Sequence, residues 1–154
     1  MFFSRKTADP LYISRIDPEH PLSSFNPRGF HLDDADWPTV EHYYQAMKFE
    51  LAEQREAVRT CETPQQAREL SEQHAKAVRK DWKQVRQTMM TRAIYIRCRT
   101  HADLAAALLA TGERTLFESS QYDYFWGCGR DGRGTNAYGT VLMNVRAKLL
   151  EERS

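Results

Sequence analysis

Residues 37–49 constrain the fold of this chain more than any other segment, because they have the pattern of a helix that is apolar around most of its circumference. At about 100° per residue, one face of this helix holds Val40, Tyr43, Tyr44, Met47 and Leu51. The opposite side is largely apolar too. Such a helix must be buried, and its polar side chains are confined to one narrow stripe.

The stripe consists of Glu41, Gln45 and Lys48, which are spaced i, i+4 and i+7. The Cα atoms of Glu41 and Lys48 are roughly 10 Å apart at about 1.5 Å of rise per residue, which is far for a direct ion pair. Both side chains are nevertheless long enough to converge on one group of about sugar-ring size. A charged group beside so much apolar surface must be paired, hydrated or functional. The pattern indicates an active site, but it leaves open a helix whose Glu41 and Lys48 simply reach solvent.

Charge and cysteine content narrow the classes of function. The chain has 154 residues, with 22 Lys and Arg against 21 Asp and Glu, so no bulk basic field favours nucleic acid or membranes. Its three cysteines are odd in number and show no C-x-x-C spacing, which argues against a disulfide framework and a zinc site. We expect no metal and no cofactor. Without a leader or an apolar stretch of about 18 residues, we expect a cytoplasmic protein outside the membrane.

The length fits one domain over residues 1–154, with its core at about 11–150. Patterning predicts an α+β fold that is mainly α-helical, with a few short strands. We expect the strands at residues 11–14, 30–32 and 115–118, with a turn at 33–36. We expect the helices at residues 39–60, 64–76, 82–99, 101–111 and 138–149. Thr39, Thr63 and Asp81 are placed to cap three of them, and His42 is expected to be a structural histidine.

Five of the seven glycines fall within residues 126–139. Gly127, Gly129 and Gly132 spell G-x-G-x-x-G, but no buried strand precedes them and too few residues follow for a dinucleotide-binding unit. A phosphate loop fails because Gly-Lys-Ser/Thr is missing. There remains a loop that leads into the last helix, whose N-terminus can attract an anion. An ordinary connecting loop stays open as the alternative.

Four ordered motifs make the chain resemble the NADAR (YbiA-like) family. The motifs are residues 37–49, Trp126-Gly127-x-Gly129, Gly134-x-Asn136-x-x-Gly139 and Leu142-Met143-x-x-Arg146. Further matches are Asp81-Trp82-x-x-Val85-Arg86-x-x-Met89 and Ala110-Thr111-Gly112, followed in order by Leu116, Glu118 and Asp123. The resemblance covers residues 23–149, and the combination is specific although each motif alone is weak.

This resemblance implies hydrolysis of N-glycosidic bonds. Some members act on phosphoribosylamino-pyrimidine intermediates of riboflavin synthesis, and others remove ADP-ribose from modified guanine bases. We expect the first activity and hence a small phosphorylated riboside as partner, because strand-binding proteins usually carry a basic stripe that is absent here. Two alternatives stay open: an ADP-ribosyl-guanine glycohydrolase acting on nucleic acid, and a non-catalytic module that binds nucleotide or ADP-ribose.

The family's helix Glu and Lys are tied to catalysis, and the resemblance places them at Glu41 and Lys48. Glu41 would stabilise an oxocarbenium-like state, or act as a general base if its aromatic surroundings raise its pKa. Lys48 would form a Schiff base with the opened sugar if burial lowers its pKa, and would otherwise be a cationic clamp.

We expect further side chains to bind the substrate, with one or two tryptophans stacking on the base, and Arg86, Arg146 and loop amides holding phosphate. The expected binding residues are Trp37, Gln45, Trp82, Arg86, Asp123, Trp126, Gly127, Gly129, Asn136 and Arg146. One departure stands out, since the family's Ser-Asn-Phe motif is Ser23-Ser24-Phe25 here. The shorter Ser24 leaves the choice of substrate open.

Overall fold

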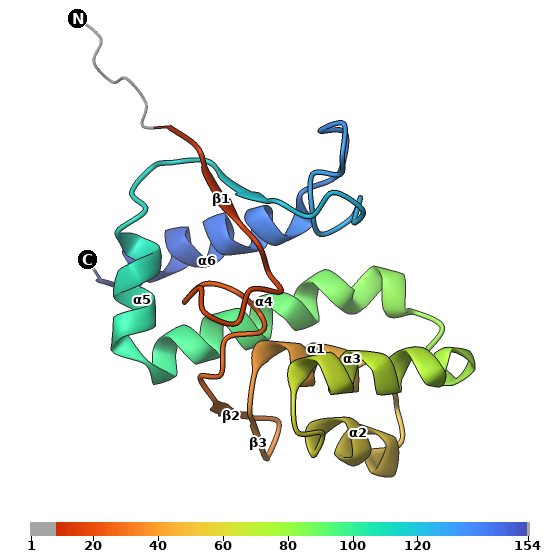
Figure 1. Cartoon of the computed structure of the whole chain (residues 1–154). Helices are drawn as coiled ribbons and strands as arrows, with labels where there is room; N and C mark the ends of the chain where they lie inside the picture. The colour runs from red at the N-terminus through yellow and green to blue at the C-terminus, as the bar shows by residue number, and fades with distance from the viewer. Residues whose placement is uncertain (1–8, 154) are drawn as a thin grey trace, which may run out of the picture.

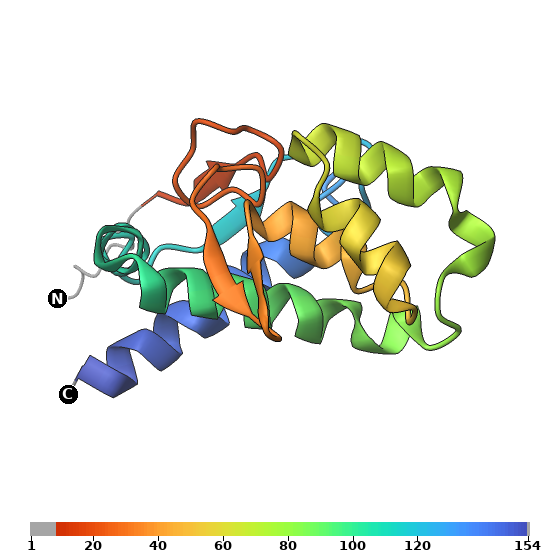
Figure 2. The same cartoon turned by 90° about the horizontal axis from the view of Figure 1, so that it is seen from below.

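A long central helix organises the fold. The computed structural model describes residues 9–153, and α4 (Trp82–Thr100) crosses the middle of the molecule with α6 (Ala137–Arg153) on one side and α1 (Val40–Ala46) on the other (Figure 1). The remaining helices are α2 (Ala52–Arg59), α3 (Pro64–Gln73), the 3₁₀ turn η1 (Ala75–Ala77) and α5 (Ala102–Leu109). Seen from below, α1 is enclosed between α4 and the α2–α3 pair (Figure 2). Burial on all sides explains why α1 is apolar around most of its circumference.

Strands contribute two small two-stranded sheets. β1 (Leu11–Ile13) runs parallel to β4 (Leu116–Glu118), and β2 (Phe30–Leu32) pairs antiparallel with β3 (Ala35–Trp37). The first pairing places the N-terminal segment beside the chain that enters the glycine-rich loop (Figure 1). The structure thus confirms the predicted α+β class, mainly helical with few short strands. No helix within residues 9–153 has the length and apolar character needed to cross a membrane.

The first predicted helix, 39–60, is in fact two helices, α1 and α2. Tertiary hydrogen bonds replace the helical ones at the break, because the Lys48 carbonyl accepts from the Arg79 amide at 2.8 Å and the Phe49 carbonyl from Arg55 Nε at 2.7 Å. The break lets Phe49 enter the core. Likewise α3 ends at Gln73 rather than near residue 76, where the chain tightens into η1.

Two further local predictions were wrong. The expected turn at residues 33–36 is shorter, because Asp33 and Asp34 at φ 54° and 61° form the whole two-residue hairpin turn. Ala35 and Asp36 therefore belong to β3. Asp81 makes no side-chain capping bond to α4, since its carboxylate accepts from Arg79 Nε at 2.7 Å instead.

Gly139 marks a close contact between α6 and β4. A Cβ atom there would lie 2.1 Å from the Leu116 carbonyl oxygen. Alanine normally stabilises a helix over glycine by about 1 kcal/mol, but we expect Gly139→Ala to destabilise the fold by about 1–3 kcal/mol because backbone must shift to make room. Urea unfolding measures this change, with Asn144→Ala at an exposed position of α6 as control. A Gly139→Ala protein at least as stable as the natural one would contradict the close contact.

Candidate active site

Glu41 and Gln45 of α1 and Lys48, in the turn just after the helix, belong to one hydrogen-bonded chain. Gln45 Nε2 donates to Glu41 Oε2 at 2.7 Å, and Ser71 Oγ of α3 donates to Gln45 Oε1 at 2.6 Å. Lys48 Nζ in turn donates to Ser71 Oγ at 3.2 Å. The carboxylate and the amine therefore reach the same site although they form no direct ion pair. The sequence pattern had left a solvent-exposed Glu41 open, and its exposure of 0% excludes that.

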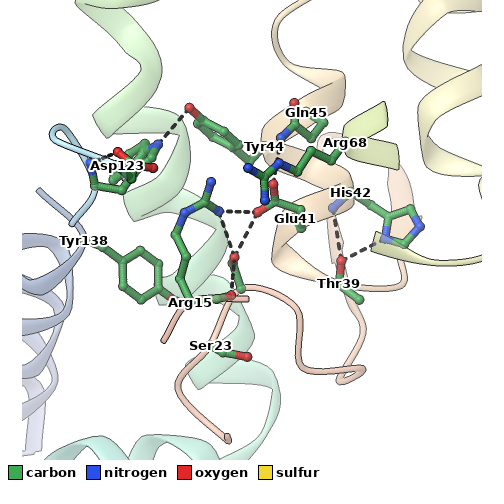
Figure 3. Close-up of polar contacts among 12 residues, drawn as sticks. Arg15, Ser23, Thr39, Glu41, His42, Tyr44, Gln45, Arg68, Asp123 and Tyr138 are labelled. Carbon is green, nitrogen blue, oxygen red and sulfur yellow. Dashed lines mark hydrogen bonds and ion pairs between the residues drawn. The ribbon is translucent and has the colours of Figure 1, made fainter. Parts of the chain in front are cut away.

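Glu41 is paired with an arginine from outside the helix. Arg15 Nη1 donates to Glu41 Oε1 at 2.5 Å, and Ser24 Oγ lies 2.9 Å from the same oxygen (Figure 3). Burial favours the neutral acid, but the Arg15 charge and the hydrogen bonds from Gln45 and Ser24 outweigh it, so the pKa of Glu41 is lowered. The alternative of a general base required a raised pKa, and this guanidinium removes that condition. An ionised carboxylate suits stabilisation of positive charge better than proton abstraction.

For Lys48, burial outweighs the nearby charges in setting the pKa. Its Nζ lies 5.9 Å from the centre of the Tyr44 ring, and burial lowers its pKa more than the attraction of Glu41 raises it. A lowered pKa increases the share of neutral amine near pH 7, which is the form able to attack carbon. This agrees with the condition that the sequence set for a nucleophilic lysine.

Arg15 and Glu118 are site residues that sequence reasoning missed. Arg15 is 5% exposed, and its guanidinium carbon lies 5.7 Å from the Tyr44 ring centre and 5.8 Å from that of Trp126. Glu118, 0% exposed, accepts from the Arg15 amide at 2.8 Å and from the Ser120 amide at 2.9 Å. The one available signal was a charged residue close to the end of each short strand, with Glu118 at the last position of β4 and Arg15 two residues after β1. The parallel pairing of β1 with β4 joins them across 103 positions of sequence.

Ser71 was also missed, because the many polar residues of α3 indicated an outer helix. Only Ala67 and Ser71 of α3 are buried among its described residues. Two small residues at i and i+4 in an otherwise polar helix are a usable signal, since they allow a close approach to α1.

A cavity of about 610 Å³ adjoins this chain of polar groups. Its wall is formed by Arg15, by Arg68 of α3 and by much of the loop at residues 119–125. Glu41 and Lys48 are not part of the wall, and Glu41 is connected to the cavity through its ion pair with Arg15. Arg86 supports the far side, with its guanidinium carbon 3.4 Å from the centre of the Phe125 ring.

The predicted tryptophans divide between site and core. Trp126 donates from Nε1 to the Tyr44 hydroxyl at 3.0 Å, and Trp82 packs on the same tyrosine with ring centres 5.1 Å apart. Trp37 instead packs edge-on against Tyr43 and donates to the Leu32 carbonyl at 2.8 Å. Its indole is committed to the core, so the structure does not support Trp37 as a base-stacking residue.

Two predicted substrate-binding residues, Arg146 and Asn136, have other partners. Arg146 donates to Thr111 Oγ1 at 2.8 Å, beyond the end of α5, and is not part of the cavity wall. Asn136 accepts from the Glu118 amide at 2.8 Å and donates to the Leu116 carbonyl at 3.0 Å. It therefore holds β4 against the start of α6, where the sequence had predicted a ligand contact.

The amides of the glycine-rich loop are likewise occupied. Those of Cys128 and Gly129 donate to the carbonyls of Glu118 and Ser120, and those of Ala137 and Tyr138 to carbonyls of the preceding loop. The helix N-terminus is thus not open to an anion, contrary to expectation. Close packing explains the glycines instead, because a Cβ on Gly127 would lie 2.5 Å from Glu118 Oε1, and one on Gly129 would lie 2.3 Å from the Tyr124 ring.

Asp123 and His42 shape the surroundings. Asp123 Oδ1 accepts from the Phe125 and Trp126 amides at 3.0 and 2.8 Å while the residue also lines the cavity. His42 bridges Thr39 Oγ1 at 2.8 Å and the Cys61 carbonyl at 2.9 Å, which is the structural role expected for it. Within residues 9–153, no group of three or more His, Cys, Asp or Glu side chains is arranged to hold a metal ion.

Comparison with known proteins adds independent findings. A family model for the NADAR domain matches residues 2–150. The chain is 39% identical over 143 residues to the N-glycosidase Npun_R5314 of Nostoc punctiforme, covering 90% of this chain and 92% of that protein. It is 38% identical over 143 residues to the riboflavin biosynthesis protein VVA0006 of Vibrio vulnificus, covering 92% of this chain and 39% of that longer protein. The solution structure of Escherichia coli YbiA superposes with a TM-score of 0.83 at 34% identity, covering 96% of this chain and 89% of that one.

Proposed function

The chain belongs to the NADAR domain family, and from this membership and the geometry of the site we propose that it is an N-glycosidase of riboflavin-biosynthesis intermediates. Its reaction is hydrolysis of the ribosyl C1′–N bond of a phosphoribosylamino-pyrimidine. The observation that carries the proposal is the ionised, buried Glu41 joined to Lys48 through Gln45 and Ser71 beside a cavity.

The chemistry follows from the charges. As the C1′–N bond breaks, positive charge develops on C1′ and the ring oxygen, and a fixed carboxylate in a dry site stabilises it. The departing nitrogen takes a proton, and water supplies the hydroxyl that ends on C1′. Because Arg15 covers Glu41 in this structure, the carboxylate reaches the sugar only when the guanidinium shifts.

Lys48 has a role on the same carbon. A neutral amine attacks C1′, the base leaves with a proton, and the opened sugar is held as a Schiff base until water releases it and restores the amine. The low pKa of Lys48 supports this route over a purely cationic clamp. Trp126 donates a hydrogen bond to the Tyr44 hydroxyl, and the Tyr44 ring lies next to the Lys48 amine.

The proposal is tested by incubating the protein with a panel of ribosides and detecting the free base and sugar phosphate. We expect turnover of the phosphoribosylamino-pyrimidine and little release from ADP-ribosyl-guanine oligonucleotides. Turnover of the oligonucleotide alone would show that the protein is an ADP-ribosyl-guanine glycohydrolase instead. Binding without cleavage of any substrate would indicate a non-catalytic module.

The pH dependence of kcat tests the protonation states proposed for Glu41 and Lys48. Glu41 has a lowered pKa, so it stays ionised through the neutral range and imposes no acid limb there. Lys48 has a lowered pKa and acts as the neutral amine, so kcat is expected to rise as pH increases through a value below that of an ordinary lysine. Steady-state rates from pH 5 to 10 measure this. A rate independent of pH across that range would exclude amine ionisation as part of the chemical step.

A further inference from the structure

Two guanidinium groups line the cavity of this site. They belong to Arg15, which follows β1 by two residues, and to Arg68 of α3, and both side chains lie beside Glu41 (Figure 3). Each guanidinium also lowers the pKa of Lys48.

Carboxylates balance these charges. Glu41 and Glu118 are both fully buried beside Arg15, where Glu41 accepts from its guanidinium and Glu118 from its backbone amide. Asp123 lines the cavity, with one oxygen committed to two backbone amides, and the exposed Glu72 lies 3.6 Å from Arg68 Nε. What favours an anion here is therefore the guanidinium donors at the cavity wall rather than an excess of positive charge.

Arg15 has an unused face that points to a ligand. Within residues 9–153, all hydrogen bonds of its side chain run through Nη1, to Glu41 and Ser24. Nε and Nη2 remain, and they form one edge of the guanidinium fork with the geometry that suits two oxygens of a phosphate. Arg15 is 5% exposed and lies at the cavity wall, so this free donor edge is available to a ligand in the cavity.

We propose that Arg15 and Arg68 bind the phosphate group of the riboside substrate in this cavity and so determine its specificity for phosphorylated ribosides. This inference rests on the proposed function, since it names the group by which the same site recognises its substrate. Phosphate binding also draws the Arg15 guanidinium toward the cavity, which uncovers Glu41 for the sugar. Arg15 and Arg68 thus have the role that the sequence had predicted for Arg86, Arg146 and the loop amides.

Arg15→Lys and Arg68→Gln test the proposal. Lysine keeps a positive charge beside Glu41 but lacks the fork, and Arg68 is removable at a half-exposed position of α3. For the phosphorylated riboside, KM is expected to rise about 10- to 100-fold in each variant, the effect of losing charge-assisted hydrogen bonds. For the same riboside without phosphate, KM of Arg68→Gln is expected to stay within about twofold of the natural protein's value, because Arg68 makes no hydrogen bond to Glu41 or Lys48 among the described residues. Arg99→Gln, which removes an exposed arginine paired with Glu152, serves as control.

Binding of inorganic phosphate, measured by calorimetry, provides a readout that does not depend on turnover. We expect the natural protein and Arg99→Gln to bind phosphate, and the other two variants to bind it at least tenfold more weakly. The proposal would be overturned if the KM of Arg68→Gln rose equally for both ribosides. It would also be overturned if phosphate affinity were unchanged in Arg15→Lys and Arg68→Gln. If the natural protein cleaves neither riboside but phosphate affinity still depends on Arg15 and Arg68, the proposed function fails and the phosphate site stands.

Discussion

Glu41→Gln is expected to lower kcat for release of the free base by about 10²- to 10⁴-fold, the range for removing one group that stabilises charge or moves a proton in the transition state. Glutamine has nearly the same shape and can still bond Gln45 and Ser24, so the loss isolates the negative charge. Release of base followed by chromatography measures the rate. The control is Glu56→Gln, which removes an exposed carboxylate of α2 that pairs only with Arg59.

The same substitution has a predicted effect on stability. It leaves the buried Arg15 without its counter-charge, and breaking such a pair from one side costs about 3–5 kcal/mol. Because the pKa of Glu41 is lowered in the folded state, this stabilisation is present above the ordinary carboxyl pKa and is lost as pH falls through the lowered value. The difference in unfolding free energy between the two proteins should therefore be large at pH 7 and shrink as the pH falls below the ordinary carboxyl range. Full turnover in a folded Glu41→Gln protein would contradict the role of the carboxylate.

Lys48→Met is expected to reduce kcat by at least about 10²-fold, because it removes both the nucleophile and the positive charge next to Tyr44. Lys48→Arg separates these two functions, since arginine keeps the charge but does not deprotonate. We expect Lys48→Arg to be as slow as Lys48→Met. Lys83→Met, at an exposed position of α4, controls for loss of a lysine.

Borohydride provides a chemical test of the same residue. Reduction during turnover is expected to convert the Schiff base into a stable secondary amine, which mass spectrometry locates at Lys48 as an added sugar phosphate. An absent adduct together with a fast Lys48→Arg protein would show that Lys48 acts as a clamp.

The burial of α1 could be predicted from sequence because its information is local. The period of apolar residues in residues 37–49 requires burial, and burial leaves Glu41, Gln45 and Lys48 on the one polar stripe. The end of that helix could not be predicted, because the carbonyls at the break are satisfied by Arg79 and Arg55 from later in the chain.

The partners of Glu41 could not be predicted from sequence for a different reason. Arg15 approaches through the pairing of β1 with β4, a contact between segments of three residues each that are far apart in the chain. Nothing in the sequence around either strand specifies its partner. The sequence could therefore not decide whether the pKa of Glu41 is raised or lowered. It also included Arg146 among the expected phosphate ligands, although this residue lies beside Thr111.

Glu41 and Lys48 are proposed to act together on the ribosyl C1′–N bond. The most direct test is a cycle of kcat values for the natural protein, Glu41→Gln, Lys48→Met and the double variant, each shown to be folded. Groups that act as a unit are not additive, so each single change should remove most of the activity and the double variant should be no slower than the slower single one. Full turnover in both single variants, or losses that multiply in the double variant, would contradict this joint action.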